Sequence, residues 1–394
     1  MTDRPSQTPH PETDAVHRGE GAVAGAAPVT TPIYAATTFM FDDTADFERY
    51  LEGDSDRYIY SRDANPTVQA VEAKLAALEG AEAALVTSSG QAATSTALFG
   101  LLNQGDELVM SGASYGGTLE LVAAHLARFG VRTRYATIEE LGRPEALLGA
   151  ATRALWCESP TNPTLRCVDL ARLAAACREA GVVSIVDNTF ASPINQRPLA
   201  LGVDLVMHSA TKYLNGHSDV TAGALAGRAE LIERLQPARK IIGGVLDPAA
   251  AYALGRGMKT LAVRIARHNE NATRVASWLA DSGKAARVFY PGLPSHPDHD
   301  VARRQMTGFG GMVTFEARGG YEAACRFFDR IRLIRRAASL GGVESLCSLP
   351  VLTSQRGLSD AQLAAAGVTR GMVRLSIGIE HADDLIADLD QALG

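Results

Sequence analysis

The chain has 394 residues, of which 46% are hydrophobic and 21% charged, with a net charge of −6, as expected for a globular protein of two domains or of one large α/β domain with a smaller partner. The acidic balance gives no electrostatic case for binding nucleic acid or an anionic membrane, and no apolar run reaches the roughly 20 residues of a membrane span. The five cysteines form neither a disulfide framework nor close zinc-type pairs, so we expect no metal site and, with no signal peptide visible, a cytoplasmic protein.

The first two thirds of the chain read as an arm followed by an α/β domain. We expect a disordered tail over residues 1–13, rich in Pro, Thr and charge, and an extended arm from about Asp14 to Arg57, which lacks periodicity. From about Pro66, short apolar runs alternate with Ala-rich amphipathic segments, which predicts a mostly parallel sheet covered on both faces by helices. The predicted strands are Ala83–Val86, Glu107–Met110, Thr152–Trp156, Val182–Val186 and Leu205–Met207, and the predicted helices include Val68–Leu78, Thr118–Phe129 and Asp169–Ala180.

The last third predicts a separate, smaller unit. A long helical stretch from about Pro248 to Ser282 reads as a connector. Strands near Met312–Glu316 and Met372–Ile377, with helices near Tyr321–Arg330 and Ala382–Leu393, predict a compact α+β C-terminal domain. No G-x-G-x-x-G follows a strand, which disfavours a NAD-dependent α/β enzyme.

Three features in the middle of the chain point to one chemistry. Asp187 ends a buried-strand run, and the carboxyl ends of strands line the ligand crevice of an open α/β sheet. An acid there can pair with a protonated pyridine nitrogen. Lys212 follows another short strand beside the hydroxyl residues Ser209 and Thr211, so it can attach a carbonyl cofactor while the hydroxyls bind a phosphate. Residues 88–91, Ser-Ser-Gly-Gln, precede a helix, whose free N–H groups favour a phosphate.

Each of these features also has a simpler structural explanation. An Asp at a strand end often caps a helix, a Lys after a Thr is usually solvated, and Ser-Ser-Gly before a helix is most often a capping turn. Their occurrence together, in this order on alternating strands and helices, favours pyridoxal 5′-phosphate (PLP) as the cofactor.

Short motifs elsewhere extend this pattern. They are Tyr60-Ser61-Arg62 with Asn65-Pro66-Thr67, Ser89-Gly90, Tyr115-Gly116-Gly117-Thr118, Ser159-Pro160-Thr161-Asn162-Pro163, Asp187-Asn188-Thr189, His208-Ser209-Ala210-Thr211-Lys212-Tyr213, Ser339-Leu340-Gly341-Gly342-Val343-Glu344-Ser345 and Arg374-Leu375-Ser376-Ile377-Gly378. In this set and order the chain, from about Val16 to Leu393, resembles the Cys/Met-metabolism PLP enzymes, the transsulfuration group of cystathionine γ-synthases, cystathionine lyases and methionine γ-lyases.

The resemblance implies a fold and a domain division. The fold is that of PLP-dependent, aspartate-aminotransferase-like (fold type I) enzymes, with a large α/β domain and a smaller α+β C-terminal domain. We expect an N-terminal tail and arm contacting a neighbouring subunit over residues 1–60, the PLP-binding domain over 61–255, and the connector helix with the C-terminal domain over 256–394. The family commonly forms a homotetramer of two catalytic homodimers.

The resemblance also implies roles for individual residues. Lys212 would hold the cofactor and shuttle protons, Asp187 would pair with the pyridine nitrogen, and Tyr115 would stack on the ring and act as an acid or base. Arg374 would clamp the substrate carboxylate, assisted by Ser339 and Asn162. The remaining cofactor-binding positions are Ser89, Gly90, Gln91, Thr189, Ser209 and Thr211 from one subunit, with Tyr60 and Arg62 from its neighbour.

A few positions bear on which substrate the protein prefers, and the sequence leaves this choice open. Cystathionine-handling members usually carry charged residues where this chain has Ile59, Glu120 and Ala338, and Ile59 and Ala338 make the pocket more apolar, as in methionine γ-lyases. Lys240 resembles a lysine that those lyases bring towards the partner's tyrosine, although Gly117 stands where they usually have Cys. Glu120 is either a solvated helix residue or a contact for a cationic substrate end.

The resulting functional prediction is γ-elimination on a sulfur-type amino acid such as methionine, homocysteine or cystathionine, giving an α-keto acid, ammonia and a thiol. The alternative is γ-replacement on an O-acylhomoserine or a similar γ-activated amino acid. A homologue that binds PLP without catalysis is disfavoured, because Lys212, Tyr115, Asp187 and Arg374 occur together.

Overall fold

The N-terminal segment is partly helical. The computed structural model describes residues 10–20, 28–357 and 359–394, so most of the predicted disordered tail lies outside the described residues. The prediction is wrong at residues 11–13, because helix α1 (Pro11–His17) begins there, with proline in its first turn and acidic residues near its positive end. Asp14 and Ala15 of this helix are buried.

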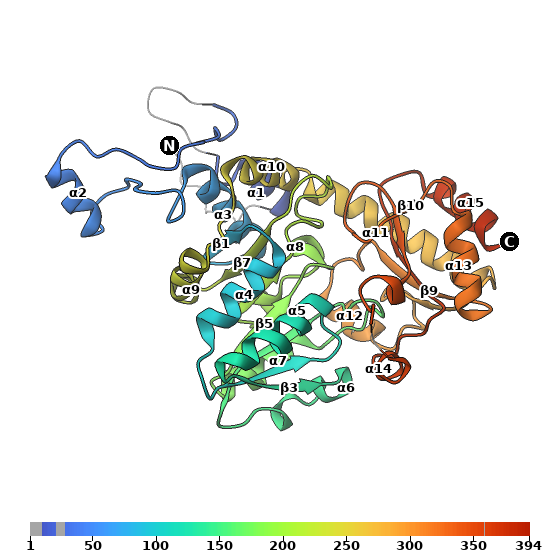
Figure 1. The fold of residues 1–394 in the computed structure, drawn as a ribbon. Coiled ribbons are helices and arrows are strands. Elements are labelled where there is room, and N and C mark those ends of the chain that lie inside the picture. Colours follow the sequence, from blue (N-terminus) through green and yellow to red (C-terminus); the bar gives the residue numbers. More distant parts are fainter. Residues whose placement is uncertain (1–9, 21–27, 358) are drawn as a thin grey trace, which may run out of the picture.

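The arm that follows projects from the body of the molecule. Figure 1 shows it at the far end from the C-terminus, with the short helix α2 (Thr44–Leu51) at its tip. Asp43 caps α2 by accepting the N–H of Asp46 at 2.8 Å. Over the described residues 28–57 the arm is therefore extended for most of its length, as expected, but contains one capped helix.

A seven-stranded sheet forms the larger part of the fold, in the order β1-β7-β6-β5-β4-β2-β3. From β6 to β3 the neighbouring strands are parallel, whereas β7 pairs antiparallel with β1 and β6. The strands are β1 (Ala83–Thr87), β2 (Glu107–Ser111), β3 (Arg132–Ala136), β4 (Thr152–Glu158), β5 (Val183–Asp187), β6 (Leu205–His208) and β7 (Gly223–Gly227). The carboxyl ends of β4, β5 and β6 consequently lie side by side.

Helices cover both faces of this sheet. They are α3 (Pro66–Glu79), α4 (Gly90–Leu101), α5 (Gly116–Glu120), α6 (Ile138–Leu141), α7 (Leu170–Glu179), α8 (Ser192–Asn195), α9 (Ala229–Ile242) and α10 (Pro248–Met258). On β4, Trp156 packs in one core with Leu98 of α4 and Leu235 of α9, while its neighbour Leu155 packs in another with Leu173 of α7. This alternation is that of a strand buried on both faces.

The C-terminal domain is built on a second sheet, in the order β10-β11-β12-β9-β8, in which all neighbours except β10 and β11 are antiparallel. Its elements are α11 (Leu261–Asp281), β8 (Ala285–Phe289), α12 (His299–Gln305), β9 (Met312–Ala317), α13 (Gly320–Arg330), β10 (Arg335–Arg336), β11 (Leu346–Ser348), α14 (Asp360–Ala365), β12 (Met372–Ser376) and α15 (Ala382–Leu393). The predicted α/β fold with a second, smaller domain is confirmed. The predicted connector consists of two helices, α10 and α11, which are separated at Lys259 and Thr260.

None of the helices in the described ranges is long and apolar enough to cross a membrane.

A buried carboxylate shapes the turn that leads from α13 into β10. Asp388 of α15 accepts the backbone N–H groups of Arg332 at 2.8 Å and of Leu333 and Ile334 at 2.9 Å. We predict that Asp388→Ala lowers the free energy of unfolding by about 2–3 kcal/mol, because buried N–H groups lose a charged acceptor. Thermal unfolding would measure this loss. Asp388→Asn should lose less stability, and Asp384→Ala, at an exposed position of the same helix, is the control; equal melting temperatures for all of these proteins would contradict the prediction.

Candidate active site

A cavity of about 450 Å³ opens at the carboxyl edge of the large sheet, and residues of both domains line it. Its walls come from the ends of β4, β5 and β6, from the N-terminus of α4, and from β12 and the loop before β11 in the C-terminal domain. Of the predicted site residues, the cavity brings together Ser89, Gly90, Gln91, Tyr115, Asn162, Asp187, Thr189, Ser209, Thr211, Lys212, Ala338, Ser339 and Arg374.

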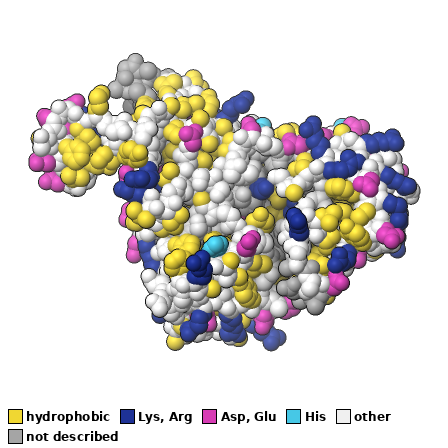
Figure 2. Space-filling model, viewed as in Figure 1, with side chains coloured by type: hydrophobic (Ala, Val, Ile, Leu, Met, Phe, Trp, Pro, Cys, Tyr) yellow, Lys and Arg dark blue, Asp and Glu magenta, His cyan; other side chains and the backbone are white. Residues whose placement is uncertain are grey.

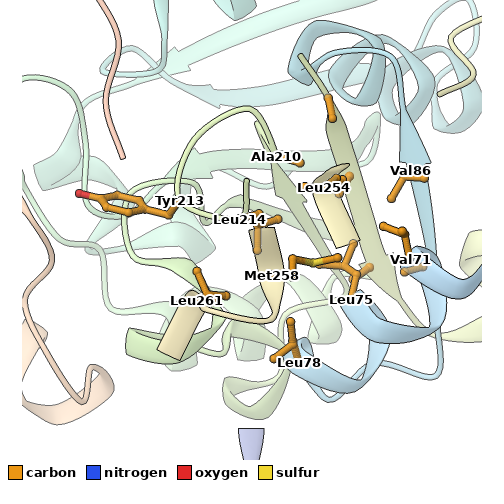
Figure 3. Packing of buried hydrophobic residues seen from close by; sticks show 14 of the residues in the cluster. Val71, Leu75, Leu78, Val86, Ala210, Tyr213, Leu214, Leu254, Met258 and Leu261 are labelled. Carbon is orange, nitrogen blue, oxygen red and sulfur yellow. The ribbon is translucent and has the colours of Figure 1, made fainter. Parts of the chain in front are cut away.

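Lys212 projects into this cavity from a loop that is anchored in the core. Its neighbours Ala210, Tyr213 and Leu214 are buried and belong to one apolar cluster, together with Leu75 of α3 and Met258 of α10 (Figure 3). The Lys212 amine donates a hydrogen bond to the Ser339 hydroxyl at 3.0 Å.

Burial, and then the charge of Arg374, lowers the pKa of Lys212. The amine therefore becomes neutral at lower pH than an exposed lysine, which favours nucleophilic attack on a carbonyl group.

Asp187 is held at the end of β5 by Thr189. Both the hydroxyl and the backbone N–H of Thr189 donate to Asp187 Oδ1, the N–H at 3.0 Å. Burial raises the pKa of Asp187, while the bonds from Thr189 and the neighbouring His208 act to lower it. Because the Thr189 hydroxyl also accepts the N–H of Ser209 at 2.8 Å, one side chain ties Asp187 to the loop that carries Lys212.

The N-terminus of α4 forms a cradle for an anion. Ser89 caps the helix by accepting the Ala92 N–H at 3.0 Å, and the first N–H groups of a helix have no partner within it. A Cβ at Gly90 would lie 2.9 Å from Ser209 Cβ, so glycine allows the two loops to meet here. The free N–H groups of this first turn fit the phosphate of PLP.

The two hydroxyls of the Lys212 loop differ in their availability. Thr211 donates to the Ala222 carbonyl at 3.0 Å and accepts its N–H at 2.9 Å. The Ser209 hydroxyl lines the cavity without a hydrogen bond to any described residue. Ser209 is thus the readier phosphate donor of the two.

Arg374 reaches the cavity from β12 of the C-terminal domain. Its guanidinium donates to Asn162 Oδ1 at 3.0 Å and to the Ser339 carbonyl at 3.3 Å. Both partners are uncharged, so they orient the guanidinium without neutralising it. Burial lowers the pKa of Arg374 to about 10, so the group is positive at neutral pH and suits a carboxylate.

Tyr115 stands at the entrance, with 48% of its surface exposed. A Cβ at Gly117 would lie 2.7 Å from Tyr115 Cε1 and 2.4 Å from Gln91 Nε2. The absence of a side chain at position 117 therefore lets both side chains pack against the first turn of α5.

Other predicted site residues lie elsewhere in the single chain. The guanidinium of Arg62 stacks 5.3 Å from the ring centre of Tyr60, and neither residue lines the cavity, nor does Ile59. Lys240 forms an ion pair with Asp63 and does not reach Tyr115 of its own chain.

Glu120 lies in a second, wider cavity of about 1000 Å³. The two cavities share four lining residues, Tyr115, Asn162, Thr353 and Ser354, so the second one continues directly from the first.

Several lining residues were not predicted from the sequence. They are Thr94, Thr118, Glu158, Pro160, Phe190, Met207, Thr221 and Leu340. Glu158 could have been predicted on the same grounds as Asp187, because it also ends a parallel strand. The predicted strand stopped at Trp156, whereas β4 continues to Glu158.

Comparison with known proteins agrees with this geometry. The sequence model of the family described as Cys/Met metabolism PLP-dependent enzyme matches residues 12–394. An L-methionine gamma-lyase from Pseudomonas putida is 40% identical over 97% of this chain and 96% of that protein. A cystathionine gamma-synthase from Mycobacterium tuberculosis is 43% identical over 98% of this chain and 97% of that protein.

Two solved structures show the same architecture. The structure of metB from Corynebacterium glutamicum has a TM-score of 0.92 at 39% identity and covers 98% of each chain. A cystathionine gamma-lyase from Lactobacillus plantarum, complexed with L-serine, has a TM-score of 0.91 at 37% identity and covers 97% of this chain and 98% of that one.

The contacts of Thr189 generate a prediction about cofactor binding. Thr189→Val removes the hydroxyl bond that lowers the pKa of Asp187, so Asp187 is protonated more readily and pairs less well with a pyridine nitrogen. We expect the Kd for PLP to rise by about 10- to 100-fold, since losing such a bond costs about 1–3 kcal/mol. Fluorescence titration would measure it, and Thr189→Ser should restore binding; unchanged affinity in the valine variant would contradict the role of Thr189.

Proposed function

The chain belongs to the family of Cys/Met metabolism PLP-dependent enzymes, and we propose that it catalyses γ-elimination on a sulfur amino acid with an uncharged side chain. The products would be an α-keto acid, ammonia and a thiol. Methionine and homocysteine are the substrates that best suit the cavity.

Bound PLP supplies an electron-withdrawing ring that acidifies the Cα–H and Cβ–H bonds of an attached amino acid. Asp187 would pair with its ring nitrogen, and Ser209 with the N-terminus of α4 would bind its phosphate. Ser89, Gly90, Gln91 and Thr211 complete the loops on that side of the cavity.

The other side of the cavity suits the substrate. Arg374 would hold the substrate carboxylate, with Asn162 and Ser339 orienting the guanidinium. The Lys212 amine, whose pKa is lowered, would take the Cα proton and then a proton from Cβ, and this second loss would allow the γ-thiolate to depart. The phenol of Tyr115, at the entrance, would donate a proton to the departing thiolate.

The observation that carries the choice of substrate is the apolar part of the cavity lining. It consists of Ala338, Leu340, Phe190 and Met207. None of them can pair with the distal ammonium or carboxylate of cystathionine, and a thioether side chain fits such a lining. Ile59, supplied by a neighbouring subunit, would extend the same apolar surface.

A second candidate is γ-replacement on an O-acylhomoserine. The cavity of about 1000 Å³ beside Tyr115 supports it, because a second reactant could approach through this space. The relative named cystathionine gamma-synthase, at 43% identity, is as similar to this chain as the methionine gamma-lyase.

A cationic substrate is less well supported. Glu120 shares its cavity with Arg287 and Arg356, and with Glu139, which is paired to Arg166 at 2.9 Å. The acid at position 120 therefore stands among positive charges and gives little net attraction for a cation. We propose that Glu120 is a solvated helix residue.

We further propose that the active unit is a homodimer, assembled into a homotetramer, in which Tyr60 and Arg62 complete the partner's phosphate site. Figure 2 shows hydrophobic side chains gathered on the projecting arm. They include Met40, 90% exposed, and Leu51, 68% exposed, which a single chain leaves uncovered. Lys240 and Arg239 hold Asp63 on α9, so the Tyr60–Arg62 segment is fixed on the outside of its own subunit.

The five free cysteines suit the reducing cytoplasm, where we place the protein.

A substrate panel tests the proposed reaction. Incubation of the holoenzyme with methionine, homocysteine, cystathionine and O-acylhomoserines should release 2-oxobutanoate and ammonia fastest from methionine or homocysteine. Thiol release would be followed in parallel, and Lys212→Ala serves as the inactive control. Formation of a thioether product only when an O-acylhomoserine and a thiol are both present would support γ-replacement instead.

Mixing two defective variants tests the shared site. Lys212→Ala and Arg62→Ala should each be nearly inactive alone, because each dimer then lacks one component in both sites. After unfolding and refolding together, randomly paired subunits should recover about a quarter of native activity, since half of the dimers regain one complete site. Absence of recovery would show that Arg62 does not act across the subunit boundary.

A further inference from the structure

A second carboxyl group lies beside Asp187, and the proposed function gives it no task. Glu158 of β4 and Asp187 of β5 are directly opposite each other in the parallel register. On β4, Trp156 faces the core formed by α4 and α9, as Ile185 does on β5. Since side chains two residues apart share a face, Glu158 and Asp187 both point to that side, about 5 Å apart along the sheet. Both line the cavity.

Glu158 is the more enclosed of the two and has a specific contact. Only 4% of its surface is exposed, and its Oε1 accepts the backbone N–H of Tyr115. This bond joins the end of β4 to the residue that starts α5. The position of the Tyr115 ring at the entrance therefore depends on Glu158.

The two carboxyl groups differ in what stabilises a negative charge. Asp187 accepts two hydrogen bonds from Thr189, and the charge of the neighbouring His208 also acts to lower its pKa, whereas Glu158 accepts one backbone N–H. Burial, and then the charge of Asp187, raises the pKa of Glu158 well above its usual value. Lys212 and Arg374 line the same cavity. Because two adjacent buried carboxyls cannot easily both ionise, the proton of the pair resides on Glu158.

We propose that Glu158 is a positioning residue that works in its neutral form. Its carbonyl oxygen fixes the Tyr115 backbone, and its bound proton leaves the negative charge of the pair on Asp187, facing the cofactor nitrogen. The inference rests on the proposed position of PLP in this cavity.

Two substitutions distinguish a role of the neutral Glu158 side chain from a role of its negative charge. Glu158→Gln keeps an acceptor for the Tyr115 N–H and has no charge, so it should retain the native absorbance of bound PLP and a kcat/KM within about threefold of native. Glu158→Leu removes the acceptor and leaves a buried N–H unpaired. Its kcat should fall by about 10- to 100-fold, with a smaller change in the Kd for PLP, because Tyr115 is displaced while Asp187 remains. Glu107→Gln, at the opposite end of the sheet, is the matched control.

The pH dependence of stability provides a readout apart from activity. A carboxyl with a raised pKa in the folded protein binds its proton more tightly there than in the unfolded chain. The free energy of unfolding of native protein, compared with that of Glu158→Gln, should therefore decrease as pH rises above about 4.5. The melting temperature of Glu158→Gln should rise relative to native protein between about pH 5 and pH 8.

Each contrary result is informative. If Glu158→Gln loses as much kcat as Glu158→Leu, the charge of Glu158 is needed and the proposal is wrong. If Glu158→Leu matches native protein, or if the melting-temperature difference is independent of pH, the proposal also fails. Failure of the cofactor placement itself is distinguishable, because native protein would then show no PLP absorbance that depends on Lys212.

Discussion

Asp187 ends a strand in the interior, and a carboxylate in that position is stable only if neighbouring groups replace the water it has lost. Thr189 supplies two hydrogen bonds to it, and the same hydroxyl orders the loop that begins at Ser209. The Thr189 hydroxyl thus holds both Asp187 and the loop that carries Lys212. The phosphate cradle joins this arrangement through the close approach of Gly90 to Ser209. The candidate cofactor site is thus one connected unit, held by hydrogen bonds and by close packing, at the carboxyl edge of three parallel strands.

The other half of the site comes from the C-terminal domain, so the way the two domains meet determines its geometry. The Ser339 hydroxyl accepts a hydrogen bond from the Lys212 amine, and the Arg374 guanidinium donates one to Asn162. Further from the cavity, Thr314 of β9 donates to the Pro163 carbonyl at 2.7 Å, and Asp298 binds Arg166 at 2.6 Å. The contacts of Arg374, Thr314 and Asp298 all fall on the segment that follows β4. That segment therefore helps to hold Arg374 and the C-terminal domain in place relative to the large sheet.

Five strands of the large sheet and the residues at their ends could be predicted from the sequence, because buried parallel strands are short, apolar and followed by polar residues. In the same sheet β3 and β7 were not predicted, since β3 is largely exposed at the sheet edge and β7, Gly-Ala-Leu-Ala-Gly, lacks the usual strand residues. In the second sheet β8, β10 and β11 were not predicted. Glu158 was not predicted as a site residue because the predicted strand ended at Trp156. Tyr60 and Lys240 do not line the cavity of their own chain, and the proposed roles for them require a second chain, which no pattern within one sequence describes. The contacts of Thr211 with Ala222 likewise arise from tertiary packing.

Gly117 has a consequence for how the site can change by mutation. A side chain at this position would overlap both Gln91 and the Tyr115 ring, one in the phosphate cradle and the other at the entrance. The residues at positions 91, 115 and 117 are consequently interdependent, because a larger residue at 117 requires the Gln91 amide and the Tyr115 ring to move. Since Gln91 belongs to the proposed phosphate site and Tyr115 stands at the entrance, such a substitution would affect both. Exchange of this residue between related enzymes is therefore not a neutral test of specificity.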